Sequence, residues 1–242
     1  MAEAVMREKK RREQTRFGVL PDTVSLLIRE PGSALTHFAG LILLQAASGP
    51  LIIRAREHGS LFTIGGICVF LLAACLLYAA STTYHTVVSG EGLTTVLRKL
   101  DHISISVMIA GTYTPICLTA LRGKAGYLLL AAVWALALGG AVMKLFWITC
   151  PKWVSSVLYI AMGWLCVFAF RPLLRAVPRG AFLWLLAGGL LYTAGAMIYA
   201  SHPKKFDEKH IYFGSHEIFH VFIMLGTLCH YIVMYCYIAL IP

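Results

Sequence analysis

The chain has 242 residues, of which 59% are hydrophobic and only 13% are charged. Soluble domains carry about a quarter charged residues, and disordered chains lack long apolar stretches, so both classes are excluded. The net charge of +10 is spread over the N-terminal arm and the connections, which argues against a nucleic-acid-binding protein. The composition therefore predicts an integral membrane protein.

The seven cysteines and the basic N-terminus add two expectations. The cysteines are odd in number and fall mostly inside apolar runs, which predicts buried thiols rather than a disulfide framework. The N-terminal stretch MREKKRREQTR is basic, but the first apolar run starts only near Ala34, so we expect no cleaved signal peptide. We expect a basic cytoplasmic arm over residues 1–29 and a membrane domain over residues 30–242.

Seven apolar runs are long enough to cross a bilayer, because a spanning helix needs about 20 predominantly apolar residues. In chain order they cover residues 35–53, 61–87, 102–121, 126–146, 154–174, 181–200 and 215–240. We therefore predict an all-α, integral membrane bundle of seven transmembrane helices.

The distribution of Lys and Arg predicts the orientation of these helices. With seven spans, 14 of the 21 basic residues fall on the side of the N-terminal arm and 7 fall on the opposite side. Loops rich in Lys and Arg stay in the cytoplasm. The predicted N-terminus is therefore cytoplasmic and the C-terminus lies outside.

Polar and ionisable side chains stand at the ends of four predicted spans. They are Glu30 and His37 in the first, Ser81 and His85 in the second, Asp101 and His102 in the third, and His216, Glu217 and His220 in the seventh. With the N-terminus inside, all of these ends lie at the cytoplasmic level of the membrane. Ionisable residues within spans are candidates for function.

Three of the histidines are predicted to form a metal site. His216 and His220 are spaced i, i+4, so their rings share one helical face with about 6 Å between Cβ atoms. A third imidazole from another helix, for which His85 is our candidate, completes the three protein ligands of a catalytic zinc site. Ser81 lies one turn before His85, and Asp101 is placed to hold or deprotonate a zinc-bound water, whose pKa falls to about 7.

Simpler structural roles compete with these assignments. We expect His230 and His102 to bond a neighbouring helix, and His37 either to do the same or to support the site from behind. Asp101 is also well placed as the N-cap of the third span. Ser81 can equally bond a carbonyl one turn back in its own helix.

A protease is a further alternative. Residues 216–220 read His-Glu-Ile-Phe-His, which satisfies the HExxH pattern of zinc proteases with Glu217 as general base. Proteases of this kind that cut within membranes usually add an Asp from a downstream Asp-Gly-type motif. The residues after His220 contain no Asp or Glu, so we rank this alternative low.

The chain resembles the hemolysin III family, the bacterial branch of the progestin and adipoQ receptor family, from about Glu30 to Tyr237. The matching motifs are Glu-x6-His at Glu30, Ser-x3-His at Ser81, and the runs LDHISISVMIAGTYTP, PKWVSSVLYIAMGW, GGLLYTAGAMIYA and HEIFH. One departure is Ser33, where the bacterial family typically has Asn, and it puts in doubt any amide-mediated contact at that position.

The resemblance implies a seven-helix fold with a zinc ion near the cytoplasmic side. The implied ligands are His85, His216 and His220. Asp101 corresponds to the acidic residue near the metal-bound water, and Ser81 corresponds to the serine of the site. Relatives in the wider superfamily include alkaline ceramidases, which hydrolyse lipid amides.

We therefore expect a zinc-dependent hydrolase of a bacterial inner membrane, acting on a lipid amide or ester with Asp101 and Ser81 as catalytic residues. The resemblance also implies a link to membrane homeostasis. One alternative is a zinc-organised sensor or regulator without turnover. Another is a pore-forming haemolysin or a transporter, although transport paths usually place ionisable residues at several depths. The adiponectin-receptor branch carries Gln where Glu217 stands, which weakens the protease alternative, and the sequence indicates no oligomeric state.

Overall fold

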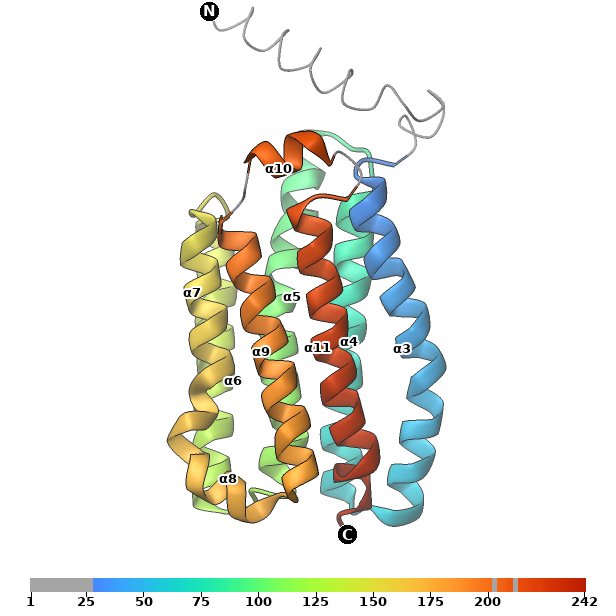
Figure 1. Ribbon diagram of the computed structural model, residues 1–242, viewed down its shortest axis with the longest axis vertical. Helices are drawn as coiled ribbons and strands as arrows, with labels where there is room; N and C mark the ends of the chain where they lie inside the picture. The colour runs from blue at the N-terminus through green and yellow to red at the C-terminus, as the bar shows by residue number, and fades with distance from the viewer. Residues whose placement is uncertain (1–27, 202–203, 211–212) are drawn as a thin grey trace, which may run out of the picture.

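The computed structural model describes residues 28–201, 204–210 and 213–242. Helices account for all the regular structure in these ranges, and they stand side by side in an elongated bundle (Figure 1). Residues 1–27 of the predicted basic arm lie outside the described residues.

The bundle is built from long helices with two short helical additions. The long helices are α3 (Pro31–His58), α4 (Leu61–Thr86), α5 (Glu91–Leu118), α6 (Lys124–Phe146), α9 (Arg179–Ser201) and α11 (Ser215–Cys236). Between α6 and α9 the chain forms α7 (Lys152–Gly163), the 3-10 helix η1 (Trp164–Ala169) and α8 (Phe170–Ala176). The additions are α10 (Lys204–Lys209), which lies across the end where α3 and α11 begin, and η2 (Ile238–Leu240) (Figure 1).

Six segments are long and apolar enough to cross a membrane. They are α3, α4, α6, the combined α7–η1–α8 segment, α9, and α11 extended to Leu240. The helix α5 is not among them, because Asp101, His102 and several Ser and Thr residues interrupt its apolar stretch. The all-α class is confirmed, and six of the seven predicted spans correspond to helices that suit a membrane.

Helix ends differ from the predicted ones. The helix α5 begins at Glu91 rather than residue 102, and α3 runs to His58 rather than residue 53. Hydropathy marks only the apolar stretch, whereas a helix continues as long as its backbone hydrogen bonds do. The sequence analysis also predicts neither α10 nor the 3-10 stretch of η1.

Close helix contacts depend on small residues. The helix α4 packs between α3 and α5, and α11 packs against α3 and α9. A Cβ atom at Gly66 of α4 would lie 2.6 Å from the Cα atom of Pro115 in α5. Because lipid is as apolar as the helices, packing of small residues drives helix association in membranes. Gly66 therefore sets the distance between α4 and α5.

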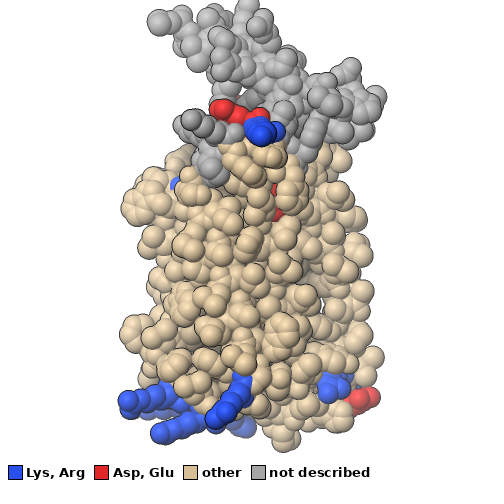
Figure 2. Space-filling view, in the orientation of Figure 1, with Lys and Arg blue, Asp and Glu red and all other residues tan. Residues whose placement is uncertain are grey.

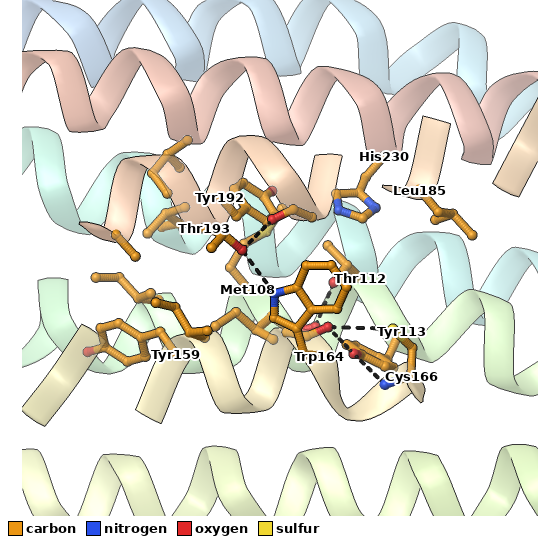
Figure 3. Close-up of a pocket in the computed structure, with 18 of the residues that line it drawn as sticks. Met108, Thr112, Tyr113, Tyr159, Trp164, Cys166, Leu185, Tyr192, Thr193 and His230 are labelled. Atoms are coloured by element: carbon orange, nitrogen blue, oxygen red, sulfur yellow. Dashed lines mark hydrogen bonds between the residues drawn. The ribbon is translucent and has the colours of Figure 1, made fainter. Parts of the chain in front are cut away.

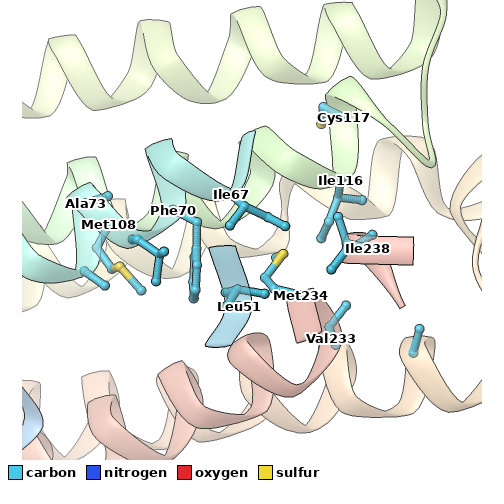
Figure 4. Packing of buried hydrophobic residues seen from close by; sticks show 14 of the residues in the cluster. Leu51, Ile67, Phe70, Ala73, Met108, Ile116, Cys117, Val233, Met234 and Ile238 are labelled. Carbon is cyan, nitrogen blue, oxygen red and sulfur yellow. The ribbon is translucent and has the colours of Figure 1, made fainter. Parts of the chain in front are cut away.

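A cluster of buried apolar side chains lies where α3, α4, α5 and α11 meet (Figure 4). Its members include Leu51, Ile67, Phe70, Met108, Ile116, Val233, Met234 and Ile238. Leu51, Ile67 and Phe70 are fully buried. Interiors packed this closely lose stability when even a few methylene groups are removed.

The outer surface has an uncharged belt between two charged ends (Figure 2). Exposed Leu, Phe, Val and Ile side chains occupy this belt, which suits contact with lipid. The basic residues at the end remote from α10 are Arg54, Arg56, Arg122, Lys124, Arg171, Arg175 and Arg179. The structure thus has the surface pattern of a multi-pass membrane protein.

Candidate metal centre

Three histidine side chains meet near the end of the bundle at which α10 lies. His85 is in the last turn of α4, and His216 and His220 are in the first turns of α11. One ring nitrogen from each lies within 4.8 Å of the other two, and the Nε2 atoms of His85 and His216 are 3.3 Å apart. The rings of His85 and His220 are buried. The three histidines singled out by the sequence therefore come together in space.

The distance between two of these nitrogens is that expected at a tetrahedral zinc ion. Zinc binds imidazole nitrogen at about 2.0–2.1 Å, which places two nitrogens of a tetrahedral site roughly 3.3 Å apart. The Nε2 atoms of His85 and His216 have that separation. Three imidazoles are also a donor set that zinc uses in catalytic sites, although other divalent ions accept the same set.

Two of the three rings are held from behind by side chains at the start of α3. The carboxylate of Glu30 bonds Nδ1 of His85. The hydroxyl of Thr36 lies 3.0 Å from Nδ1 of His220. In both rings Nε2 is then the nitrogen left for a metal, and such outer partners fix the tautomer and orientation of metal-binding histidines. The sequence indicates Glu30 as a candidate but not its hydrogen-bond partner His85. It gives no indication of the role of Thr36 beyond the position of this residue inside the Glu-x6-His motif.

Glu30 is an ionised anchor for the end of α4. Burial acts to raise its pKa, but the hydrogen bond with His85 and the charges of His85 and Arg29 outweigh burial and hold the pKa below its usual range. The backbone N–H of Glu30 also donates to the carbonyl oxygen of His85 at 2.9 Å. These contacts tie the start of α3 to the end of α4 and keep the carboxylate against the ring.

Buried polar atoms without partners surround the histidines. Both ring nitrogens of His37 and the hydroxyl of Ser81 have no hydrogen-bond partner among the described residues. The His37 ring stacks on His220 with 3.6 Å between centroids. Buried polar groups in folded proteins are normally bonded. Ser81 thus makes no bond to a carbonyl one turn back, and that alternative role is wrong for this residue.

Asp101 lies inside α5 and lines the same space as the histidines. Since α5 begins at Glu91, Asp101 is not an N-cap, and the capping alternative is wrong. Its carboxylate is buried and lies 3.4 Å from Nδ1 of His102. That same nitrogen is 2.8 Å from the carbonyl oxygen of Arg98, within α5 itself. The ring of His102 therefore bonds its own helix and Asp101, while the backbone carbonyl of His102 accepts a hydrogen bond from the hydroxyl of Tyr159 in α7 at 2.9 Å.

Glu217 makes hydrogen bonds that do not suit the role of general base. Its carboxylate accepts a hydrogen bond from the backbone N–H of Gly214 at 2.9 Å and another from the hydroxyl of Ser33. This arrangement caps the start of α11 and links it to the start of α3. Ser33 thus makes its contact with α11 through a hydroxyl. The carboxylate is committed to structure, which disfavours the protease alternative.

A cavity of about 190 Å³ runs from the histidines into the bundle, between α5, η1, α9 and α11 (Figure 3). His37, Asp101, His216 and His220 lie among the residues at its polar end. Most of its remaining wall is aliphatic and aromatic, and Met108, Tyr159, Trp164 and Leu185 are examples in view (Figure 3). The cavity therefore joins a polar end to a long apolar space.

The few polar groups deeper in the cavity mostly bond one another. Trp164 Nε1 donates to the hydroxyl of Thr193 at 3.0 Å, and the hydroxyls of Tyr192 and Thr227 are 3.0 Å apart. His230 stacks on Tyr192, and its Nδ1 atom has no partner among the described residues. His230 thus contacts a neighbouring helix by stacking, away from the three clustered histidines.

The amino-acid sequence is similar to those of known proteins over most of its length. A family model described as haemolysin-III related matches residues 26–231. The Hemolysin-3 homolog of Bacillus subtilis (strain 168) is 35% identical over 88% of this chain and 96% of that protein. Hemolysin-3 of Bacillus cereus is 38% identical over 82% of this chain and 86% of that protein. Progestin and adipoQ receptor-like protein 1 of Caenorhabditis elegans is 24% identical over 84% of this chain and 50% of that protein.

Proposed function

The chain belongs to the haemolysin-III related family, within the wider progestin and adipoQ receptor group, and from this premise we propose that it is a zinc-dependent hydrolase of membrane lipids. The observation that carries the proposal is the meeting of His85, His216 and His220 at the polar end of an apolar cavity. The bond cleaved is an amide or ester close to a lipid headgroup, with the acyl chain lying in the cavity.

The three imidazoles would hold zinc, and Glu30 and Thr36 keep two of the rings oriented through their Nδ1 atoms. Zinc in such a set would supply Lewis acidity and lower the pKa of a coordinated water to about 7.

The remaining steps belong to side chains of this protein. Asp101 accepts a proton at its buried carboxylate, with His102 holding that carboxylate in place. The unpartnered hydroxyl of Ser81 donates to the oxyanion that develops at the carbonyl. The apolar wall of the cavity keeps bulk water from the reacting groups.

The proposal includes a topology and a location. We place α5 as the third of seven spans, with its polar first turns at the membrane surface. The excess of Lys and Arg on the side of the histidines puts that side and the N-terminus in the cytoplasm. The two Hemolysin-3 relatives named above are bacterial, and we place this protein in the inner (plasma) membrane of a bacterium.

The test compares Asp101→Asn with wild type, purified in lipid nanodiscs and loaded with zinc. Release of free fatty acid from a panel of lipid amides and esters is followed by mass spectrometry, beside metal content. We expect Asp101→Asn to keep about one zinc per chain and to lose at least roughly a hundredfold in rate. Glu91→Gln, which changes an exposed acid of the same helix, should match wild type.

Wild type that binds zinc and cleaves no member of the panel would contradict the hydrolase proposal. That outcome would favour a zinc-organised sensor without turnover. Equal rates for wild type and Asp101→Asn would remove Asp101 from the chemistry.

A further inference from the structure

A second buried polar cluster lies where α6 connects to α7, and it shares no residue with the candidate metal centre. Lys144, in the last turn of α6, directs its Nζ atom at the sulfur of Cys150 (3.1 Å) and at the hydroxyl of Ser155 (2.6 Å). The Cys150 sulfur and the Ser155 hydroxyl are 3.3 Å apart. All three side chains are buried, and Lys144 is only 2% exposed.

The charge of Lys144 needs an anionic partner. A buried ammonium without a counter-ion is strongly unfavourable. Among the residues that the structure describes, no carboxylate forms an ion pair with Lys144. The one neighbouring group that can carry a negative charge is the thiol of Cys150. A thiolate at Cys150 would supply that partner.

The surroundings of Cys150 favour that thiolate. Burial acts to raise its pKa, but hydrogen bonds from Ser155 and Lys144, and the positive charges of Lys144 and Arg98, lower the pKa below its usual value. Cys150 also directly precedes Pro151, the N-cap of α7, and the N-terminus of a helix stabilises negative charge.

Among the residues that the structure describes, no other cysteine has such a partner. All seven cysteines are free thiols. Cys75 accepts a hydrogen bond from the neutral amide of Gln45, and Cys166 donates to the carbonyl oxygen of Gly163. Cys150 is thus the one cysteine in the described parts of the chain that bonds a charged side chain.

The position of Cys150 suits a reactant that comes from the membrane surface. The exposed side chains of Trp147 and Trp153 flank it in the chain. Tryptophan gathers at the boundary between lipid and water. The sulfur itself is nearly covered, so a small reactive group reaches it more easily than a protein partner does.

We propose that Cys150 is an activated thiolate, paired with Lys144, and that it is a site of oxidation by hydroperoxides. The sulfur attacks one oxygen of the hydroperoxide, and the S–O bond forms as the O–O bond breaks. The departing alkoxide or hydroxide takes a proton from the Lys144 ammonium and leaves as alcohol or water.

The sulfur loses two electrons and the peroxide gains them, which leaves a sulfenic acid at Cys150. The neutral Lys144 amine then takes the sulfenic acid proton, so a charged pair remains. The described residues place no second cysteine in contact with Cys150, so the oxidised sulfur stays available to a small thiol.

The first test measures the pH dependence of alkylation at each cysteine. Purified protein in lipid nanodiscs is treated with iodoacetamide from pH 5 to pH 10, and each cysteine peptide is quantified by mass spectrometry. We expect the midpoint for Cys150 to lie at least about one pH unit below that of the exposed Cys236. At pH 6.5, Lys144→Met should react roughly tenfold more slowly at Cys150 and should leave Cys236 unchanged.

A matched control is Lys124→Met, which removes a lysine at the opposite end of the bundle and should change neither cysteine. The wild-type midpoint by itself keeps the test decisive if Lys144→Met fails to fold. A Cys150 midpoint equal to that of Cys236 overturns the proposal. So does a failure of Cys150 to react in folded protein over a time that labels Cys236 completely.

The second test measures the oxidation of Cys150 directly. Hydrogen peroxide in the buffer and a fatty-acid hydroperoxide in the bilayer are applied separately, and sulfenic acid is trapped with dimedone. Trapping at Cys150 in either arm, lost in Lys144→Met, supports the proposal, and the faster arm identifies the source of the peroxide. No trapping at Cys150 in either arm overturns it.

Discussion

The same helices behave differently at their two ends. At the end near α10, α3, α4 and α11 bring together a carboxylate, hydroxyls and imidazoles, some of them without partners. At the opposite end the same helices meet through apolar side chains such as Leu51, Phe70 and Val233, packed without exposed surface. The apolar end therefore contributes close packing, whereas the polar end holds buried polar groups that lack partners among the described residues.

The contrast between the two ends of the bundle is tested most severely by removing a metal ligand at the polar end. We expect His220→Ala to reduce zinc from about one ion per chain to less than roughly a tenth, because two imidazoles bind the metal far more weakly than three. Metal content of the purified protein, measured by mass spectrometry, checks this. His230→Ala removes a buried histidine outside the cluster and should keep the metal. Equal zinc in wild type and His220→Ala would show that the cluster is structural.

At the apolar end the expected effect is on stability alone. Phe70 is fully buried, so Phe70→Ala should lower the free energy of unfolding by about 3–5 kcal/mol. Denaturant or thermal unfolding in detergent measures the loss. At low temperature the folded variant should still bind zinc. A variant that unfolds no more easily than wild type, or that loses its metal while folded, would break the division between the two ends.

The support behind the ligands should have an intermediate effect. Glu30→Gln keeps the shape of the side chain but removes the charge that orients His85. Loss of such an outer partner typically weakens metal affinity by about 10–100-fold. Competition with a chelator of known affinity gives the change. Glu57→Gln, an exposed acid at the far end of α3, serves as the control and should bind zinc as wild type does.

The smallest effect on stability is expected at Ser81. Its buried hydroxyl has no partner, so Ser81→Ala removes an unsatisfied group and should change the free energy of unfolding by less than about 1 kcal/mol. The same substitution should slow lipid hydrolysis while leaving zinc in place. A large loss of stability would instead reveal a structural bond at Ser81 and would blur the contrast between the two ends.

Much of this architecture follows from local patterns. Long apolar runs predict membrane helices directly, and an i, i+4 pair of histidines predicts one shared helical face. The position of His85 at the end of α4 and of His216 at the start of α11 then suffices to place them at one level. Helix ends are harder to predict, because α5 continues through polar residues that hydropathy excludes.

The contacts around the site were decided by packing between distant segments. Asp101 looks like an N-cap in the sequence, yet it lies well inside α5 and faces the cavity. Nothing local indicates that Glu30 bonds His85, since 55 positions separate them. The pairing of Lys144 with Cys150 is local by contrast, because six positions separate them, and it depends on the turn between α6 and α7.

By itself the sequence determined the class of protein, the places of the apolar helices and the residue types that can bind a metal, because these depend on composition and on spacing within one helix. Only the tertiary structure decided which nitrogen of the His85 and His220 rings is free, which carboxylate supports His85 and where the cavity runs. Those features depend on the relative rotation and depth of helices that are far apart in the chain, and a few ångströms of displacement would separate every one of these contacts.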